Sequence, residues 1–167
     1  MQDKEATTVS IGALAAIATY LTETAVLVPT WVTFIGWTSF YAVGAGTTGF
    51  MRSVVANLGG VVIGSITLLA MHLGANSAML IALAVGVASA VAVQASKVSV
   101  FGALPAIFFG FSCTVGTAAV TGKSVLTMTI DSPVLVAATA LVLGNAFGIA
   151  SQWLAEMLGM SRNVQGD

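Results

Sequence analysis

Two short segments of the sequence repeat one arrangement of an aromatic ring and a hydroxyl group. Phe34 and Thr38 stand four residues apart in FIGWTSF, and Phe108 and Ser112 have the same spacing in FFGFSCT. Residues at this spacing share one face of a helix, so each segment is expected to present a ring beside a hydroxyl. Two such pairs that face each other would form a slot for a small, flat, polar and uncharged solute. The alternative is that the four side chains only pack and hydrogen-bond between helices.

Two further polar residues stand near the ends of apolar runs. Glu23, in YLTETAV, is the only acid well inside such a run. A carboxylate in a membrane costs about 2.5 to 3.5 kcal/mol or more unless it faces protein or water. Gln94 lies within one residue of the position that pairs with Glu23 when the two halves of the chain are aligned. We predict that these residues lie at the two mouths of the slot; alternatively, Glu23 reaches surface water and Gln94 bonds to a neighbouring helix.

The sequence does not indicate catalysis, a metal site or a cofactor. An intramembrane hydrolase needs a nucleophile with a base, or two facing carboxylates. Only one acidic residue, Glu23, lies well inside an apolar run. His72 has no second histidine, cysteine or acid at ligand spacing, and its place at the end of an apolar run is typical of a solvated residue. Cys113 is the single cysteine and is expected to pack. We expect a protein that is not an enzyme.

Composition places the chain in a lipid bilayer. Hydrophobic residues make up 57% of it and charged residues 7%, with a mean hydropathy of +1.02. An ordinary soluble domain has about 25% charged residues. The net charge of −1 and the scattered Lys and Arg residues offer no surface for nucleic acid. The N-terminal segment MQDKEATTVS lacks a net positive region, so we expect no signal peptide. The first apolar run, about Val9 to Val28, is then expected to be a membrane helix.

The apolar runs predict an all-α, polytopic membrane protein with six transmembrane helices in a single domain, 1–167. The first run stops at Pro29, and Pro133 with Asp131 or Ser132 before it is typical of a helix start. The second and fifth helices are short, and cytoplasmic tails are expected at 1–8 and 159–167. The expected helices are Val9 to Val28, Trp31 to Ala45, Arg52 to Leu73, Asn76 to Ala95, Phe101 to Thr117 and Pro133 to Leu158.

The distribution of positive charge predicts the orientation. With the N-terminus inside, Lys4, Arg52, Lys97 and Arg162 lie in the cytoplasm and only Lys123 lies outside. Positive residues accumulate in short cytoplasmic loops. Both termini are therefore expected to be cytoplasmic.

The two halves of the chain align as a repeat. Repeat A covers about 9–74 and repeat B about 76–158, and the second half is longer by the outer loop 117–131, whose sequence fits a strand, a re-entrant turn or a lid. Three spans per half make the repeat inverted, with an axis in the membrane plane. The alternative is chance similarity between helices rich in Gly, Ala and Val. The aligned pairs include Trp31 with Pro105, Phe34 with Phe108, Gly36 with Gly110, Trp37 with Phe111, Thr38 with Ser112, Gly60 with Gly144 and Gly64 with Gly148.

Rows of small residues predict a homo-oligomer, because they let helix backbones approach closely. There are three such rows: Gly60 and Gly64, Gly144 and Gly148, and the row Ala82, Gly86 and Ala90.

The segments WVTFIGWTSFYAVGAGTTGF and QASKVSVFGALPAIFFG, with a Gly-rich helix after the first, resemble the YcdZ-like family of small bacterial inner-membrane proteins. The resemblance covers roughly Ile11 to Gly148. It implies six helices and a bacterial inner-membrane location, and it implies no chemistry, because the function of that family is unknown.

The sequence thus favours a membrane channel or facilitator for a small neutral polar solute, with Phe34, Thr38, Phe108 and Ser112 along its path. Alternatives are an ion- or proton-coupled secondary transporter, an ion channel along an oligomer axis, and a non-conducting membrane scaffold. The expected partners are membrane lipids, the solute and further copies of the chain.

Overall fold

The chain folds into helices only over the part that the structure describes. The computed structural model describes residues 2–74 and 77–164, with side chains described for 4–74 and 77–159. Within these ranges it has six α-helices and no strand, which confirms the expected all-α class. The elements are α1 (Gln2–Thr24), α2 (Thr30–Ala42), α3 (Gly46–Leu73), α4 (Ala78–Ala95), the 3₁₀ turn η1 (Ser99–Phe101), α5 (Leu104–Thr121) and α6 (Pro133–Val164).

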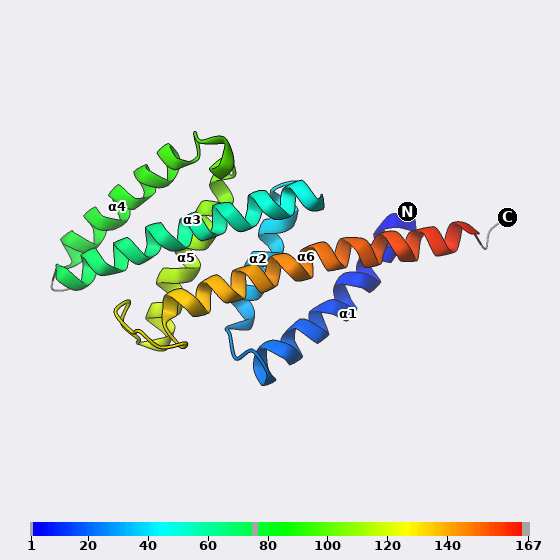
Figure 1. The fold of residues 1–167 in the computed structure, drawn as a ribbon, viewed down its shortest axis with the longest axis horizontal. Helices are drawn as coiled ribbons and strands as arrows, with labels where there is room; N and C mark the ends of the chain where they lie inside the picture. Colours follow the sequence, from blue (N-terminus) through cyan, green and yellow to red (C-terminus); the bar gives the residue numbers. More distant parts are fainter. Residues whose placement is uncertain (1, 75–76, 165–167) are drawn as a thin grey trace.

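The helices run back and forth between two ends of the molecule (Figure 1). The α4–α5 connection and the α2–α3 turn lie toward the top of the view, and the start of α1 lies toward its right. The α1–α2 and α5–α6 connections lie toward the bottom of the view, and the end of α3 and the start of α4 lie at its left. The long helices α3 and α6 cross in front of α2 and α5, and α4 and α1 flank them. The two longest helices therefore cover α2 and α5 on one side. α2 is short, with 13 residues, whereas α5 has 18 residues, as many as α4, so the expectation of a short fifth helix is wrong.

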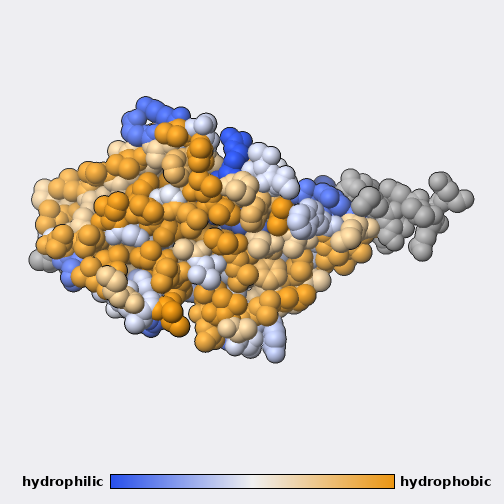
Figure 2. All heavy atoms as spheres, in the orientation of Figure 1, coloured by the Kyte–Doolittle hydropathy of each residue, from blue (hydrophilic) through white to orange (hydrophobic). Residues whose placement is uncertain are grey.

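The apolar character of the helices extends to their outer surface. Within the described residues, four helices are long and apolar enough to cross a membrane, namely α3, α4, α5 and residues 133–159 of α6. Hydrophobic residues cover most of the face shown in Figure 2. The 13 residues of α2 give a length of about 20 Å, less than the roughly 30 Å of a bilayer core. The chain is a helical membrane protein with four candidate spans in its described part.

Glycines permit a close crossing of α2 over α6. A Cβ atom built on Gly36 would lie 2.4 Å from the carbonyl oxygen of Leu141, and one on Gly144 would lie 1.9 Å from the carbonyl oxygen of Thr33. Real Cβ atoms do not approach backbone so closely. Only glycine fits at these two positions, because its missing side chain lets the two backbones touch.

The crossing of α5 over α3 uses glycines in the same way. A Cβ atom on Gly110 would lie 1.9 Å from the carbonyl oxygen of Asn57, and one on Gly60 would lie 2.0 Å from that of Ile107. The sequence alignment pairs Gly36 with Gly110 and Gly60 with Gly144. At the same spacing, it also pairs the residues whose carbonyls these glycines contact. It pairs Thr33 with Ile107 and Leu141 with Asn57.

The crossings change how the small-residue rows are interpreted. Gly60, Gly64, Gly144 and Gly148 all pack against α5 or α2 of the same chain, so these two rows are used inside the protomer. The row Ala82, Gly86 and Ala90 is exposed along α4. Only this third row is free to support contact between chains.

Several helix boundaries differ from the expected ones. The third helix begins at Gly46 and not at Arg52, directly after a reversal in which Gly44, Ala45 and Gly46 have φ of 110, 56 and 69°. Positive φ is easy for glycine and strained for alanine, so this turn is sharply defined. The first helix ends at Thr24, the fifth runs from Leu104 to Thr121, and the loop after it contains turns but no strand among its described residues. The expected start of the fourth helix, Asn76, lies outside the described residues.

Candidate functional site

The predicted ring and hydroxyl pairs lie on the surface of α2 and α5. Thr38 and Ser112 are both exposed, and Phe34 and Phe108 are half-buried. Phe34 stacks on Trp37 with ring centroids 5.8 Å apart. The two phenyl rings belong to separate clusters: Phe34 packs between α1, α2 and α6, whereas Phe108 packs against residues of α3, α4 and α5. Within one chain, therefore, the hydroxyls of Thr38 and Ser112 lie on the surface. The rings of Phe34 and Phe108 do not face each other across one slot, because they pack in different clusters.

The two polar residues predicted at the mouths lie at opposite ends of the molecule. Glu23 is exposed in the last turn of α1, where its Oε1 accepts a hydrogen bond from the Thr30 hydroxyl at 2.8 Å. Gln94 is exposed in the last turn of α4. The ends of α1 and α4 lie at the bottom and the top of Figure 1. Both side chains therefore have access to the surroundings of the chain.

A buried polar cluster between α2 and α3 was not found by sequence reasoning. Ser39, Ser53 and Asn57 are at most 1% exposed. The Ser39 hydroxyl donates to Asn57 Oδ1 at 3.1 Å, and the Ser39 and Ser53 hydroxyl oxygens are 2.7 Å apart. Asn57 Nδ2 donates to Ser53 Oγ at 3.5 Å. Because each hydroxyl has one hydrogen, Ser53 must donate to Ser39, and the three bonds close a ring.

The aligned positions of the other half carry no such ring. The alignment at the same spacing pairs Ser39 with Cys113, Ser53 with Ala137 and Asn57 with Leu141. These three residues are also fully buried, and Cys113 and Leu141 pack in one apolar cluster. The same place in the fold is thus polar between α2 and α3 and apolar between α5 and α6.

A second polar cluster holds α1, α2 and α6 together at Ser151. The Ser151 hydroxyl donates to the Gly148 carbonyl at 2.7 Å and accepts from Trp37 Nε1 at 3.1 Å. The Tyr41 hydroxyl lies 2.8 Å from the same oxygen and donates to it, because the hydrogen of Ser151 is already used. Ser10 donates to the Ser151 carbonyl at 2.5 Å. With every group satisfied, this cluster stabilises the helix packing.

Three buried oxygens have no hydrogen-bond partner in the described part of the chain. They are Thr33 Oγ1, Thr117 Oγ1 and Asn145 Oδ1, each on a residue with 0% exposure. Buried polar atoms are nearly always paired, with protein or with ordered water. These oxygens on α2, α5 and α6 are places where water or a polar solute atom would be favourable.

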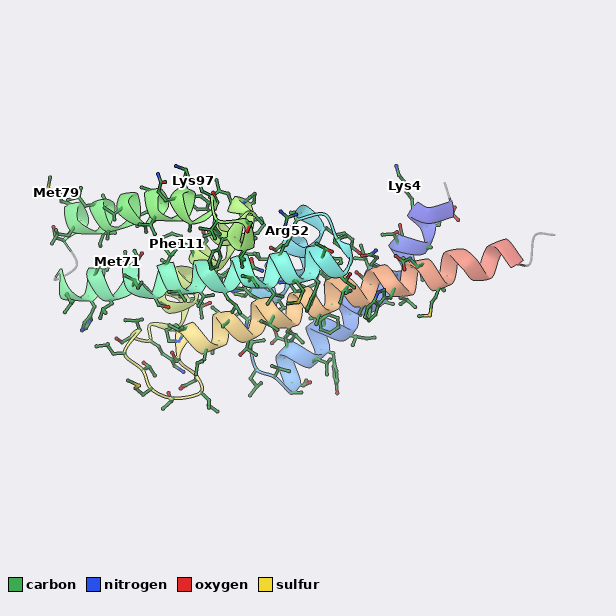
Figure 3. All side chains as sticks on the ribbon, turned by 45° about the horizontal axis from the view of Figure 1, so that its top comes forward. Lys4, Arg52, Met71, Met79, Lys97 and Phe111 are labelled. Carbon is green, nitrogen blue, oxygen red and sulfur yellow. The ribbon has the colours of Figure 1, made fainter. Side chains whose placement is uncertain are left out.

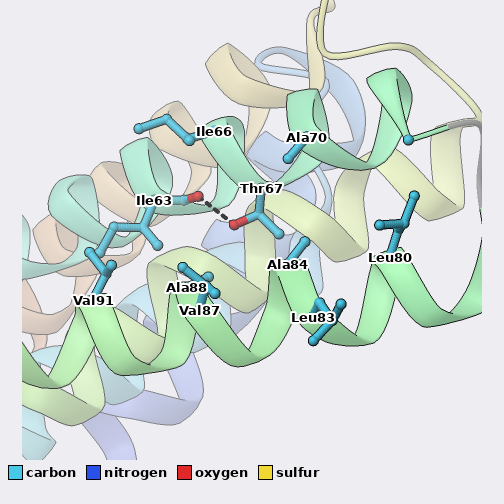
Figure 4. A pocket seen from close by; sticks show the side chains of 11 residues that line it. Ile63, Ile66, Thr67, Ala70, Leu80, Leu83, Ala84, Val87, Ala88 and Val91 are labelled. Carbon is cyan, nitrogen blue, oxygen red and sulfur yellow. Dashed lines mark hydrogen bonds between the residues drawn. The ribbon is translucent and has the colours of Figure 1, made fainter.

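Two hollows lie on either side of α3. One is an apolar groove of about 380 Å³ between α3 and α4, shown in Figure 4. Thr67 lines this groove, and its hydroxyl donates to the Ile63 carbonyl at 2.8 Å. The other, of about 450 Å³, is lined by the ends of α3 and α5 and includes His72 and Lys123. The first offers no free polar group, and the second has a polar rim.

Lys123, which lines the second hollow, forms an ion pair. Lys123 bonds to the Asp131 carboxylate, and Thr129 donates to the same carboxylate. The bond from Lys123, followed by that from Thr129, lowers the pKa of Asp131 to about 2. Asp131 therefore remains ionised throughout the neutral and mildly acidic range. No group of three potential metal ligands occurs among the residues that the structure describes.

Comparison with known proteins identifies a family. A family model described as a protein of unknown function (DUF1097) matches residues 8–156. The chain belongs to this family. No curated protein and no solved structure matches the chain. The expectation of an uncharacterised family over most of the chain is confirmed, and the YcdZ-like name stays a prediction.

Proposed function

We propose that the chain passively conducts a small neutral polar solute, urea- or amide-like, along a passage lined by Thr38 and Ser112. The observation that carries this proposal is the exposure of both hydroxyls at aligned positions of α2 and α5. Neither hydroxyl forms a hydrogen bond within the described part of the chain. Hydrocarbon offers such groups no partner, so a polar surrounding is favoured. A passage between copies of the chain supplies it.

The proposal includes an inverted repeat of six segments that cross the membrane, in which the short α2 crosses together with the non-helical residues 25–29 before it. The repeat is supported by the two glycine crossings, α2 over α6 and α5 over α3. The residues in contact at one crossing are paired by the alignment with those in contact at the other. It is also supported by the alternation of the chain between two ends of the molecule in Figure 1. An odd number of spans per half turns the second copy upside down.

We further propose a bacterial inner-membrane location with both termini in the cytoplasm. Arg52 lies near the start of α3 and Met71 near its end, whereas Met79 lies near the start of α4 and Lys97 just after its end. In Figure 3 these two basic residues lie to the right of Met71 and Met79, and Lys4 lies farther in the same direction. Lys123 follows α5 at the other end. The excess of positive side chains at one end supports a cytoplasmic position for that end.

In this proposal the passage forms in a homo-oligomer, where the exposed faces of α2 and α5 meet those of neighbouring copies. The half-buried rings of Phe34 and Phe108 flank the hydroxyls, and Glu23 and Gln94 lie near the two mouths. Hydroxyl groups replace part of the hydration of a neutral solute weakly, which lets the solute leave again. The scarcity of charge along these helices disfavours the holding of an ion.

Stopped-flow light scattering from liposomes tests the proposal, with gradients of urea, formamide, glycerol and sodium chloride. We expect flux of the neutral solutes, independent of proton and sodium gradients, and no salt flux. Loss of one hydroxyl should lower urea flux about fivefold, because one hydrogen bond contributes about 1 kcal/mol. The variants are Thr38→Val and Ser112→Val. Thr19→Val is the matched control, because Thr19 is exposed on α1 and donates to the Ala15 carbonyl at 2.9 Å.

The other outcomes of the same assay identify the competing functions. Accumulation driven by a proton or sodium gradient indicates a coupled transporter, and Glu23→Gln would then abolish proton coupling. Ohmic current indicates an ion channel along an oligomer axis. Liposomes that stay tight to every solute indicate a scaffold. Each of these three results contradicts the proposal.

A further inference from the structure

The ring of Ser39, Ser53 and Asn57 contains the hydrogen-bond pattern that recognises a carboxamide. The oxygen of the Asn57 amide accepts from one hydroxyl, and its nitrogen donates to the other. The two serines are linked to each other at 2.7 Å, so one acts as donor toward the amide and the other as acceptor. Any solute with a carbonyl oxygen and an adjacent NH₂ group carries the same two groups at the same spacing.

Helix packing alone does not require this ring. The aligned positions Cys113, Ala137 and Leu141 make the corresponding contact between α5 and α6 with apolar side chains. The two places lie beside matching glycine crossings, because a Cβ atom on Gly110 would meet the Asn57 carbonyl and one on Gly36 would meet the Leu141 carbonyl. Burial of hydroxyl and amide groups costs free energy because these groups lose water. Their hydrogen bonds outweigh this cost by only a small margin. A role that needs the polar groups themselves explains the difference between the two halves.

The ring also lies next to the proposed passage. Ser39 directly follows Thr38, and the turn of the helix between them places one hydroxyl inside the chain and the other on its surface. The bond from Asn57 Nδ2 to Ser53, at 3.5 Å, is at the limit of a hydrogen bond, whereas the other two are 2.7 and 3.1 Å. The amide nitrogen is therefore the weakly held end of the side chain.

We propose that Ser39 and Ser53 form a binding pair for carboxamides and ureas, and that the amide of Asn57 occupies it in this structure. A solute replaces that amide when the Asn57 side chain rotates away. This inference rests on the proposed function, since it names the solute class that the passage would prefer. It also makes a claim about binding that does not depend on transport.

Chemical rescue of Asn57→Ala tests the binding pair. The variant removes the amide and leaves both hydroxyls without their partner. Thermal unfolding of the purified full chain is followed in acetamide and in acetone, which has the same shape but no NH₂ group. We expect acetamide to stabilise Asn57→Ala, relative to its effect on the wild type, with an apparent dissociation constant at least tenfold lower than that of acetone. Equal effects of the two solutes would show simple filling of a cavity and would overturn the inference.

A second variant keeps the test decisive if Asn57→Ala does not fold. The triple variant Ser39→Cys, Ser53→Ala, Asn57→Leu copies the apolar residues of the other half, so it is expected to fold. It should show no preference for acetamide over acetone. In liposomes it should lower acetamide flux several-fold relative to glycerol flux, because only the amide uses the pair.

The outcomes separate this inference from the proposed function. An unchanged ratio of acetamide to glycerol flux in the triple variant contradicts the binding pair and leaves passive conduction intact. Amide-specific rescue of Asn57→Ala in a chain that conducts nothing supports the pair and contradicts conduction. If neither variant folds, the ring is needed for packing and the inference is wrong.

Discussion

The crossing of α2 over α6 gives a prediction that can be worked out from the structure. In Gly144→Ala the new Cβ atom would lie 1.9 Å from the Thr33 carbonyl oxygen and 2.8 Å from the Trp37 backbone nitrogen. Both neighbours are backbone atoms, so no side chain can move aside. The helices must separate until that first distance reaches at least 3.4 Å, where ordinary contact begins. Overpacking of this kind costs about 1–3 kcal/mol, and this clash belongs at the upper end.

The assay is equilibrium unfolding of the purified chain in mixed micelles, followed by Trp fluorescence. Gly12→Ala is the matched control, because Gly12 is also helical but has no atom within 4 Å of the added Cβ. Alanine is the better helix former by up to about 1 kcal/mol, so the control should be neutral or slightly stabilised. The equivalent variant Gly60→Ala, with a Cβ only 2.0 Å from the Ile107 carbonyl, should behave like Gly144→Ala.

We therefore expect Gly144→Ala to be less stable than Gly12→Ala by about 3 kcal/mol. Stabilities within about 0.5 kcal/mol of each other would refute the close crossing. A large loss for Gly144→Ala alone, with Gly60→Ala unaffected, would contradict the equivalence of the two crossings.

Three further predictions concern single residues. Cys113, which is fully buried, should resist a maleimide in the folded chain and react after unfolding in SDS; equal rates would place it at the surface. Lys123→Met should raise the pKa of Asp131 from about 2 toward its ordinary value, as followed by carboxyl NMR. Because the folded pKa is the lower one, any contribution of this pair to loop stability is present at neutral pH and is lost as the pH falls toward 2. In a Cys113→Ala background, a cysteine at Gly122 should be labelled from outside the cell and one at Thr47 should not; the reverse would contradict the orientation.

The sequence was sufficient for the class of fold and for several helix ends. Apolar runs predicted the all-α membrane protein. Pro133 is the first residue of α6, as predicted, because its fixed φ and missing N–H suit the first turn of a helix. Other boundaries were misplaced because hydropathy marks the part of a helix that lies in lipid and not the helix itself. α1 continues through polar residues to Gln2, and α3 begins at Gly46 before its apolar part.

The positions of side chains around the helices were harder to predict. A helix that is apolar on every side has no periodic pattern to show which face is buried. Thr38 and Ser39 are adjacent and chemically alike, yet one is exposed and the other is fully buried. The alignment of the halves contained the signal that was missed, since three polar residues of α2 and α3 stand opposite apolar ones. The glycine rows show the same limit, because close packing within one chain and between chains has the same pattern.

Urea permeability of liposomes measures the proposed conduction itself. Wild-type chain and the double variant Thr38→Val, Ser112→Val are reconstituted at equal density, and shrinkage is recorded beside protein-free liposomes. We expect the wild type to raise urea permeability at least tenfold above lipid alone. The double variant should lose most of this increase, at about fivefold per hydroxyl. Urea permeability equal to that of protein-free liposomes, or unchanged in the double variant, would contradict the proposed conduction.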